Sequence, residues 1–156
     1  MRAAVISDSH LSRPNAFFEA VYAEYLAPAD YVIHCGDHTG AAVWSYLIQH
    51  PGHISVAGNC DGFALGGDPP PLAELVLEGV RVGAVHGWGP RPGLSARIAE
   101  ALAGRFDIIF FGHSHAAEDT RYGDTRLVNP GALAPGGSLA LVDFGGGGLQ
   151  VEFVSL

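Results

Sequence analysis

The stretch RAAVISDSH, residues 2–10, joins a short apolar run to an aspartate and a histidine. Residues 2–7 carry the apolar, β-branched pattern that is typical of a buried strand. Similar runs lie at 31–35, 53–57 and 107–112, and segments with helical patterns lie between them. Apolar strands that alternate with helices predict an α/β fold.

Three helices are expected along the chain. The first is predicted to end near Leu26, with Ser12 as its N-cap and Pro14 near its first position, where proline is well tolerated. The second is expected at 41–49 and the third at about 94–103. The order of strand, helix and strand through the first two thirds of the chain is that of α/β units.

Alternating apolar and polar residues indicate two hairpins in the rest of the chain. The segment LAELVLEGVRVGAVHG, residues 72–87, is predicted to turn about Glu78 and Gly79. The segment SLALVDFGGGGLQVEFVSL, residues 138–156, is predicted to turn about the glycine run 145–148. A phosphate-binding loop is the alternative for this run, but a flexible hairpin turn is favoured because no helix follows to receive an anion.

The composition restricts the class of protein. The chain is expected to form a single domain, residues 1–156, because neither half alone is expected to bury its sheet. Sixteen acidic and eight basic residues give a net charge of −8, which argues against general binding to nucleic-acid backbones. All eight basic residues are arginines, so a P-loop lysine, a Schiff base and a lysine general base are excluded.

The cysteines and the apolar runs bear on the compartment. Cys35 and Cys60 are too few for a disulfide scaffold. The N-terminus shows no signal-peptide pattern, and no apolar run approaches the roughly 20 residues of a membrane span. We therefore expect a soluble cytoplasmic protein with reduced thiols and no membrane partner.

Seven side chains that can bind a metal follow the ends of the predicted strands. They are Asp8, His10, Asp37, Asn59, His86, His113 and His115. Ligand sites in open α/β sheets collect beyond the carboxyl ends of the strands, so these side chains are expected to meet. Carboxylate, imidazole and amide ligands suit Mn, Fe, Co, Ni or Zn better than calcium, which prefers oxygen ligands alone.

The spacing of the candidates supports a shared site. Asp8 and His10 are two residues apart, as are His113 and His115, which would put each pair on one side of an extended backbone. Glycine precedes three of the candidates, and it allows sharp turns and close approach to an ion. Each motif alone would be an ordinary turn in most proteins, but seven candidates at strand ends favour a metal site.

The other histidines carry less weight. His50 and His53 flank a Pro-Gly loop, and a structural role is favoured for both. His34 is expected to be a core histidine or one that supports a ligand. His38 could reach the site but need not.

Six short motifs resemble, in order and approximate spacing, those of the calcineurin-like metallophosphoesterases, in particular their small bacterial and archaeal phosphodiesterase branch. The motifs are DSH (8–10), GD (36–37), GNCD (58–61), HG (86–87), GHSH (112–115) and NPGA (129–132). The resemblance spans about residues 3–144. It implies a four-layer αββα sandwich with two mixed β-sheets and a two-metal site at the strand ends.

The resemblance also implies a role for each candidate ligand. Asp8, His10 and His115 would bind one metal, Asn59, His86 and His113 would bind the other, and Asp37 would bridge them. It implies a phosphodiesterase that uses a water or hydroxide activated by two divalent cations, with Mn as the expected metal and Ni, Co, Fe or Zn as alternatives. Asp37, Asn59 and His86 are then the expected catalytic residues, and Asn59 and Cys60 are expected to contact the substrate.

Cys60 departs from the pattern of many larger family members, which have a histidine there to protonate the departing oxygen. A thiol is a poor substitute for imidazole in this role, so substrates with good leaving groups should be least affected. A small side chain that only packs beside the site is the alternative for Cys60.

Two other functions remain open. The retromer subunit of this branch has the fold but is a binding module, so a non-catalytic scaffold is the rival of a phosphodiesterase, and a phosphomonoesterase differs only in substrate. Arg13, Trp88 and Arg91 are candidates for the site entrance. The expected substrate is a small phosphodiester. The sequence leaves the oligomeric state open, with a homo-oligomer as one alternative.

Overall fold

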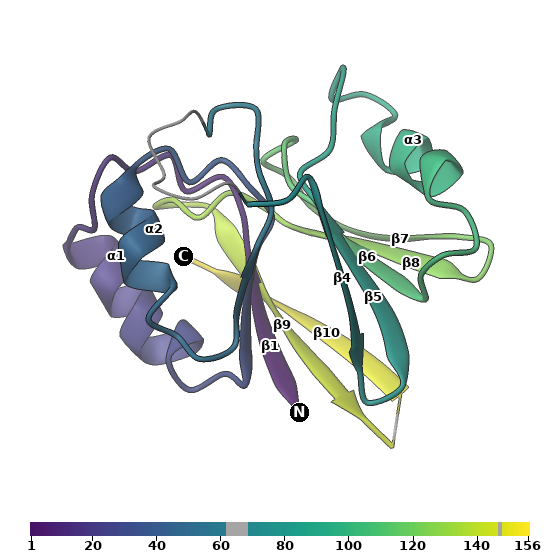
Figure 1. The fold of residues 1–156 in the computed structure, drawn as a ribbon, viewed down its shortest axis with the longest axis horizontal. Helices are drawn as coiled ribbons and strands as arrows, with labels where there is room; N and C mark the ends of the chain where they lie inside the picture. The colour runs from purple at the N-terminus through teal and green to yellow at the C-terminus, as the bar shows by residue number, and fades with distance from the viewer. Residues whose placement is uncertain (62–68, 147) are drawn as a thin grey trace.

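Two β-sheets pack face to face in this protein, and helices cover their outer faces (Figure 1). The computed structural model describes residues 1–61, 69–146 and 148–156. Helices α1 (Ala16–Val21), η1 (Tyr22–Leu26) and α2 (Ala41–Leu47) lie against the first sheet, and α3 (Leu94–Ala101) lies against the second. The predicted four-layer αββα sandwich with two mixed sheets is confirmed.

The first sheet has the strand order β10-β9-β1-β2-β3. Its strands are β1 (Arg2–Ile6), β2 (Tyr31–His34), β3 (His53–Ser55), β9 (Ser138–Gly145) and β10 (Gly148–Ser155). The strands β1, β2 and β3 are parallel, whereas β9 is antiparallel to both β1 and β10. Gly145 pairs with Gly148, which confirms the predicted hairpin; Gly147 lies outside the described residues.

The second sheet has the order β4-β5-β6-β8-β7. Its strands are β4 (Leu72–Leu77), β5 (Val80–Val85), β6 (Ile108–Phe110), β7 (Ala117–Tyr122) and β8 (Thr125–Pro130). The central strands β5, β6 and β8 are parallel, and the edge strands β4 and β7 are antiparallel to their neighbours. The β4–β5 hairpin was predicted, but β7 and β8 were not; the sequence of β7, AEDTRY, is polar and largely exposed.

Apolar clusters on both faces of the first sheet fix the position of β1. Successive residues of a strand point to opposite faces, so Val5 joins Ile33 and Phe110 in the cluster between the sheets. Ile6 joins Phe18 of α1 in the cluster under the helices. Burial on both faces explains why this strand is a continuous apolar run rather than an alternating one. A third cluster, which includes Ile98 of α3, covers the outer face of the second sheet.

The first helix begins later than predicted. Asn15 is the N-cap instead of Ser12: its backbone is extended, and its side chain accepts a hydrogen bond of 2.9 Å from the Phe18 amide. Pro14 therefore precedes the cap. The helical segment ends at Leu26 as predicted, through a π-helical turn. Within the described part of the chain, the helices are too short or too polar to cross a membrane.

Candidate metal centre

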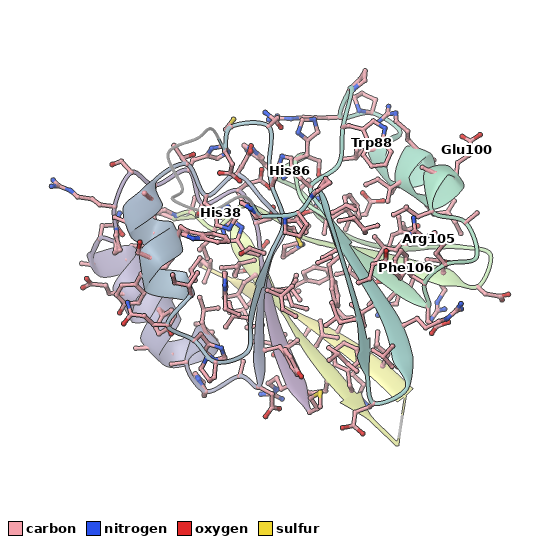
Figure 2. All side chains as sticks on the ribbon, viewed as in Figure 1. His38, His86, Trp88, Glu100, Arg105 and Phe106 are labelled. Atoms are coloured by element: carbon pink, nitrogen blue, oxygen red, sulfur yellow. The ribbon has the colours of Figure 1, made fainter. Side chains whose placement is uncertain are left out.

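The loops that follow strands β1, β2, β3, β5 and β6 meet at one edge of the sandwich and carry all seven predicted ligands. His86, directly after β5 of the second sheet, donates its Nδ1–H to the Cys35 carbonyl after β2 of the first sheet, at 2.7 Å. Figure 2 shows His86 at this junction of the two sheets. The seven candidates therefore meet at one edge, as the strand-end argument predicts.

Asp8, His10 and His115 form one group of donor atoms. The Asp8 carboxylate Oδ1 lies 3.2 Å from His115 Nε2 and 3.8 Å from His10 Nε2, and the two Nε2 atoms are 3.3 Å apart. The other carboxylate oxygen, Oδ2, accepts hydrogen bonds from the Ser7 hydroxyl and the His113 amide. Oδ1 is buried and has no hydrogen-bond partner among the described residues. A buried oxygen left in this state is costly, and a cation between it and the imidazoles would satisfy it.

Asn59, His86 and His113 form a second group. The Asn59 side-chain oxygen lies 3.0 Å from His86 Nε2 and 3.0 Å from His113 Nδ1. Each ring donates its opposite N–H to a backbone carbonyl, His86 to Cys35 and His113 to Gly89. In neutral imidazoles these bonds leave lone pairs on the two nitrogens that face Asn59. Three electron-pair donors then converge, an arrangement that a bound cation stabilises.

Asp37 lies between the two groups. Its Oδ2 is 3.7 Å from His10 Nε2 and 3.4 Å from His86 Nε2, and its Oδ1 accepts a hydrogen bond of 2.8 Å from the Cys60 amide. Burial alone would raise the pKa of this carboxyl, but its interactions with His86 and the Cys60 amide lower the pKa to about 2. Asp37 is therefore ionised at neutral pH, in the position expected of a bridging carboxylate.

The backbone of the site is strained. Among the described non-glycine residues, seven have a positive φ, and six of them lie in the site loops. Those six are Asp8, His10, Asp37, Thr39, His113 and His115, with φ between 46° and 77°. The predicted extended geometry for the two Asp/His-x-His pairs is therefore wrong: their side chains converge from left-handed backbone, not from strands. Such conformations are unfavourable for residues with a side chain and concentrate at functional sites.

Asp61 ties the Asp37 and Asn59 loops together. Its carboxylate accepts hydrogen bonds from the amides of Asp37, Thr39 and Gly58 and from His38, at 2.8–2.9 Å. Burial would raise the pKa of Asp61, but these hydrogen bonds hold it well below its usual range. In the sequence, Asp61 stood out only as the last residue of the GNCD motif.

Other contacts that position the ligands were not predicted. Asn129, from the NPGA motif, donates to the Gly112 carbonyl and the Ser114 hydroxyl, and so holds the loop between His113 and His115. The glycines before the ligands permit close contact between loops. A Cβ at Gly58 would overlap the Asp37 amide and carboxylate, and a Cβ at Gly112 would overlap the Ser7 hydroxyl.

The remaining histidines lie outside the donor groups. His34 and His38 are buried and stacked, with ring centroids 3.6 Å apart, and Figure 2 shows His38 on the side of α2. His34 accepts a hydrogen bond from the Gly36 amide, and its pKa is well below the ordinary value because of burial. His50 bonds the Ala29 carbonyl and the Gly52 amide, and His53 bonds Ser55. The structural interpretation of His50 and His53 is confirmed.

The three candidates for the site entrance are exposed. Trp88 is 44% exposed, and Arg13 and Arg91 are exposed as well. Arg97 of α3 donates to the carbonyls of Trp88, Pro90 and Pro92, and so fixes the loop whose Gly89 carbonyl orients His113. No sequence pattern indicated this role for Arg97.

Cys60 is exposed beside the donors. Its sulfur accepts a hydrogen bond of 3.3 Å from the Asn59 amide group. Burial and the neighbouring Asp37 carboxylate raise the pKa of the thiol above its usual value. The ligand atoms of His10, Asp37 and Cys60 all lie within 4.8 Å of one another.

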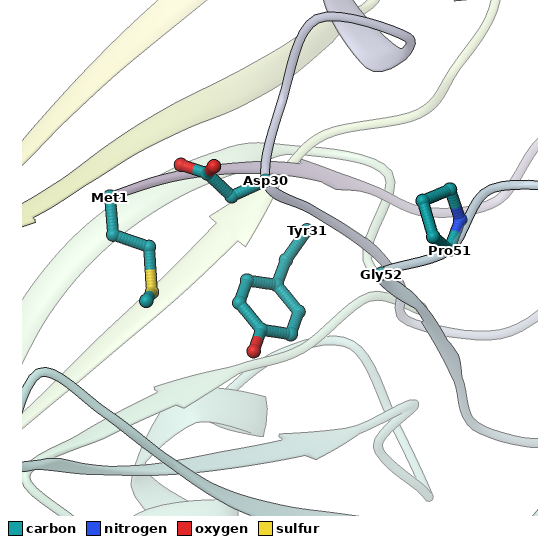
Figure 3. Close-up of a pocket in the computed structure, with 5 residues that line it drawn as sticks. All are labelled: Met1, Asp30, Tyr31, Pro51 and Gly52. Atoms are coloured by element: carbon teal, nitrogen blue, oxygen red, sulfur yellow. The ribbon is translucent and has the colours of Figure 1, made fainter.

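A pocket of about 330 Å³ lies elsewhere, at the amino ends of β1, β2 and β3 (Figure 3). Its lining is Met1, Asp30, Tyr31, Pro51 and Gly52. These residues offer one carboxylate and no imidazole, whereas the strand-end site gathers carboxylates, imidazoles and an amide. The chemistry of the donors therefore selects the strand-end site.

The comparisons with known proteins agree with this site. Residues 1–144 match the calcineurin-like phosphoesterase superfamily domain. A probable metallophosphoesterase of Methanocaldococcus jannaschii is 32% identical over 138 residues, which span 85% of this chain and 68% of that protein.

Two solved structures share the fold at lower identity. A structure described as a novel archaeal phosphodiesterase superposes with a TM-score of 0.75 at 20% identity, over 99% of this chain and all of that one. Vps29 of Entamoeba histolytica, in complex with zinc, superposes with a TM-score of 0.72 at 22% identity, over 99% of both chains. At these identities the likeness shows the fold alone.

Proposed function

The chain belongs to the calcineurin-like phosphoesterase superfamily, and from this premise we propose that it is a metal-dependent phosphodiesterase that hydrolyses small phosphodiesters at the strand-end site. The observation that carries the proposal is that seven donor side chains meet at one edge of the sandwich, where the buried Oδ1 of Asp8 has no hydrogen-bond partner among the described residues. Residues that only stabilised a fold would pair such an oxygen with a donor.

The donors divide into two cation positions. Asp8, His10 and His115 would hold one cation, and Asn59, His86 and His113 would hold the other, with Asp37 shared between them. The mixed oxygen and nitrogen donors suit Mn²⁺ first, with Fe, Co, Ni and Zn as alternatives. When bound, two divalent cations supply a nucleophilic water of lowered pKa and neutralise charge on the reacting phosphate.

The residues of the chain prepare this site before any substrate arrives. Asp37 is ionised and faces both donor groups. Hydrogen bonds to backbone carbonyls fix the ring orientations of His86 and His113. Asn59 presents an oxygen to the second position and an amide group toward Cys60, where the substrate is expected. Preorganised donors of this kind need little rearrangement during the reaction.

The charge of the chain favours a diester over a monoester. Five of the eight arginines are engaged by acidic side chains or backbone carbonyls rather than by the donors, and these are Arg2, Arg81, Arg97, Arg105 and Arg126. The bound cations would therefore supply most of the positive charge for a phosphate in a protein of net charge −8. A phosphate monoester carries about −1.5 to −2 at neutral pH, whereas a diester carries a single negative charge and needs less compensation. The same net charge argues against general nucleic-acid binding.

The rival function is a non-catalytic scaffold. The structural likeness to Vps29 raises this alternative, because a fold alone does not establish catalysis. One experiment separates the functions: the metal content of the purified chain is measured together with turnover of a bis-nitrophenyl phosphodiester and of a nitrophenyl phosphate monoester. Metal-dependent turnover of the diester supports the proposal. Turnover of the monoester alone indicates a phosphomonoesterase, and bound metal without turnover of either ester indicates the scaffold.

A further inference from the structure

Cys60 lies beside two of the candidate ligands, His10 and Asp37. Its ligand atom lies within 4.8 Å of the ligand atoms of His10 and Asp37. The ligand atoms of Asp8, Asp37 and His86 also lie within 4.8 Å of one another. Asp37 belongs to both groups. Cys60 is exposed and Asp8 is buried, so the two groups meet at Asp37 from the exposed and the buried side of the site.

The backbone of Cys60 is held in place for such a role. Its amide donates to Asp37 Oδ1 at 2.8 Å, and the loop that carries it is tied down by Asp61 through the Gly58 amide. The position of the sulfur is therefore coupled to that of the carboxylate between the two donor groups.

We propose that the Cys60 sulfur is a further ligand of the cation held by His10 and Asp37, and that it shifts the selectivity of the site toward thiophilic cations such as Co²⁺ and Zn²⁺. The inference rests on the proposed metal function. On binding, the S–H bond breaks, its electron pair forms the sulfur–metal bond, and the proton passes to solvent. Thiolate is a soft ligand, and its addition to nitrogen and oxygen donors favours softer cations.

A sulfur at this position also affects catalysis. It lies beside Asn59, where the substrate phosphate is expected to bind. With the cations bound, the sulfur would tighten metal binding and would compete with the substrate phosphate for this side of the site. This explains how a side chain that is a poor proton donor can still contribute to the site.

The sequence offers a matched control, because Cys35 and Cys60 are its only two cysteines. Cys35 is fully buried in the core between the sheets, whereas Cys60 is exposed. The metal-free chain, Cys60→Ser and Cys35→Ala are titrated with Co²⁺ and separately with Mn²⁺. Near-ultraviolet absorption reports the sulfur-to-cobalt charge-transfer band, elemental analysis reports bound metal, and circular dichroism confirms folding.

We expect the band in the unmodified chain and in Cys35→Ala, and its loss in Cys60→Ser while that variant still binds Co²⁺. The affinity for Co²⁺ should fall by about 10–100-fold in Cys60→Ser, the scale found for residues that support metal ligands, and the affinity for Mn²⁺ should fall less. X-ray absorption of the zinc-loaded chain should show a sulfur neighbour at about 2.3 Å that Cys60→Ser lacks.

Bound Co²⁺ without a sulfur band in the unmodified chain would overturn the inference and leave the proposed metal centre intact. A band that persists in Cys60→Ser would overturn it as well. No bound metal in the unmodified chain would refute the proposed function and the inference together. If Cys60→Ser does not fold, Cys60→Ala and the zinc absorption spectrum of the unmodified chain decide the question.

Discussion

Replacement of Asp61 tests whether the site loops are held together by one buried carboxylate. The side chain is 1% exposed and accepts four hydrogen bonds, three of them from backbone amides of the Asp37 and Asn59 loops. In Asp61→Ala these donors lose their partner, at about 1–3 kcal/mol for each donor that water does not reach. We expect the free energy of unfolding to fall by about 3–5 kcal/mol, out of the 5–15 kcal/mol typical of a domain. Asp61→Asn retains one acceptor oxygen and should lose about 1–3 kcal/mol.

The pH dependence of this effect has a definite sign. Burial raises the pKa of Asp61, but the bonds from His38, Thr39 and Gly58 outweigh it, so the pKa in the folded state lies below the unfolded value of about 3.9. The contribution of Asp61 to stability is therefore complete above about pH 4 and is lost as the pH falls through the folded pKa. The deficit of Asp61→Asn should shrink in the same range.

The assay is urea denaturation of the metal-free chain, so that changes in metal affinity do not contribute. Asp124→Asn is the control, because Asp124 is exposed in the turn between β7 and β8 and should change stability by less than about 0.5 kcal/mol. If Asp61→Ala and Asp124→Asn unfold at the same urea concentration, Asp61 does not hold the loops together and the reasoning is refuted.

Three further predictions concern the metal and the substrate. Arg97→Ala should weaken metal binding by about 10–100-fold, because it releases the loop whose Gly89 carbonyl orients His113; isothermal titration with Mn²⁺ measures this, and an unchanged affinity would contradict it. The affinity for Mn²⁺ should fall with falling pH, starting above the ordinary histidine value of about 6.5. Burial lowers the pKa of His86, but Asp37 and the Cys35 carbonyl raise it overall. As the pH falls, protons therefore compete with Mn²⁺ for the His86 imidazole at a higher pH than for an ordinary histidine. An Mn²⁺ affinity that does not change from pH 8 to 5 would refute this. Cys60→Ala should keep most turnover of a bis-nitrophenyl diester, and Cys60→His should raise kcat/KM selectively for poor leaving groups; an unchanged leaving-group slope would show that position 60 is not beside the scissile bond.

The sequence predicted that the seven candidates would meet because its strands are short apolar runs with polar side chains directly behind them. A strand buried on both faces, such as β1, is easily distinguished from the loop that begins at Ser7. The glycines before the ligands also carried information, since Gly58 and Gly112 leave no room for a side chain.

Other features depend on contacts between distant segments and could not be predicted. The left-handed backbone at Asp8 and His10 arises from the packing of loops, so an alternation rule for strands gave the wrong local geometry. The edge strand β7 is polar, and it is a strand because β8 offers it a partner. Arg97 acts by donating hydrogen bonds to three backbone carbonyls. Every residue has such a carbonyl, so the residue types do not indicate which ones an arginine will bind.

The central claim is a paired metal site bridged by Asp37, and metal content tests it most directly. The metal-free chain and Asp37→Ala are each reconstituted with Mn²⁺, freed of unbound metal and measured by elemental analysis. We predict roughly two ions per unmodified chain and a clear loss in Asp37→Ala, because Asp37 is the carboxylate that faces both donor groups. Saturation at one ion per chain, with Asp37→Ala unchanged, would contradict the bridged site.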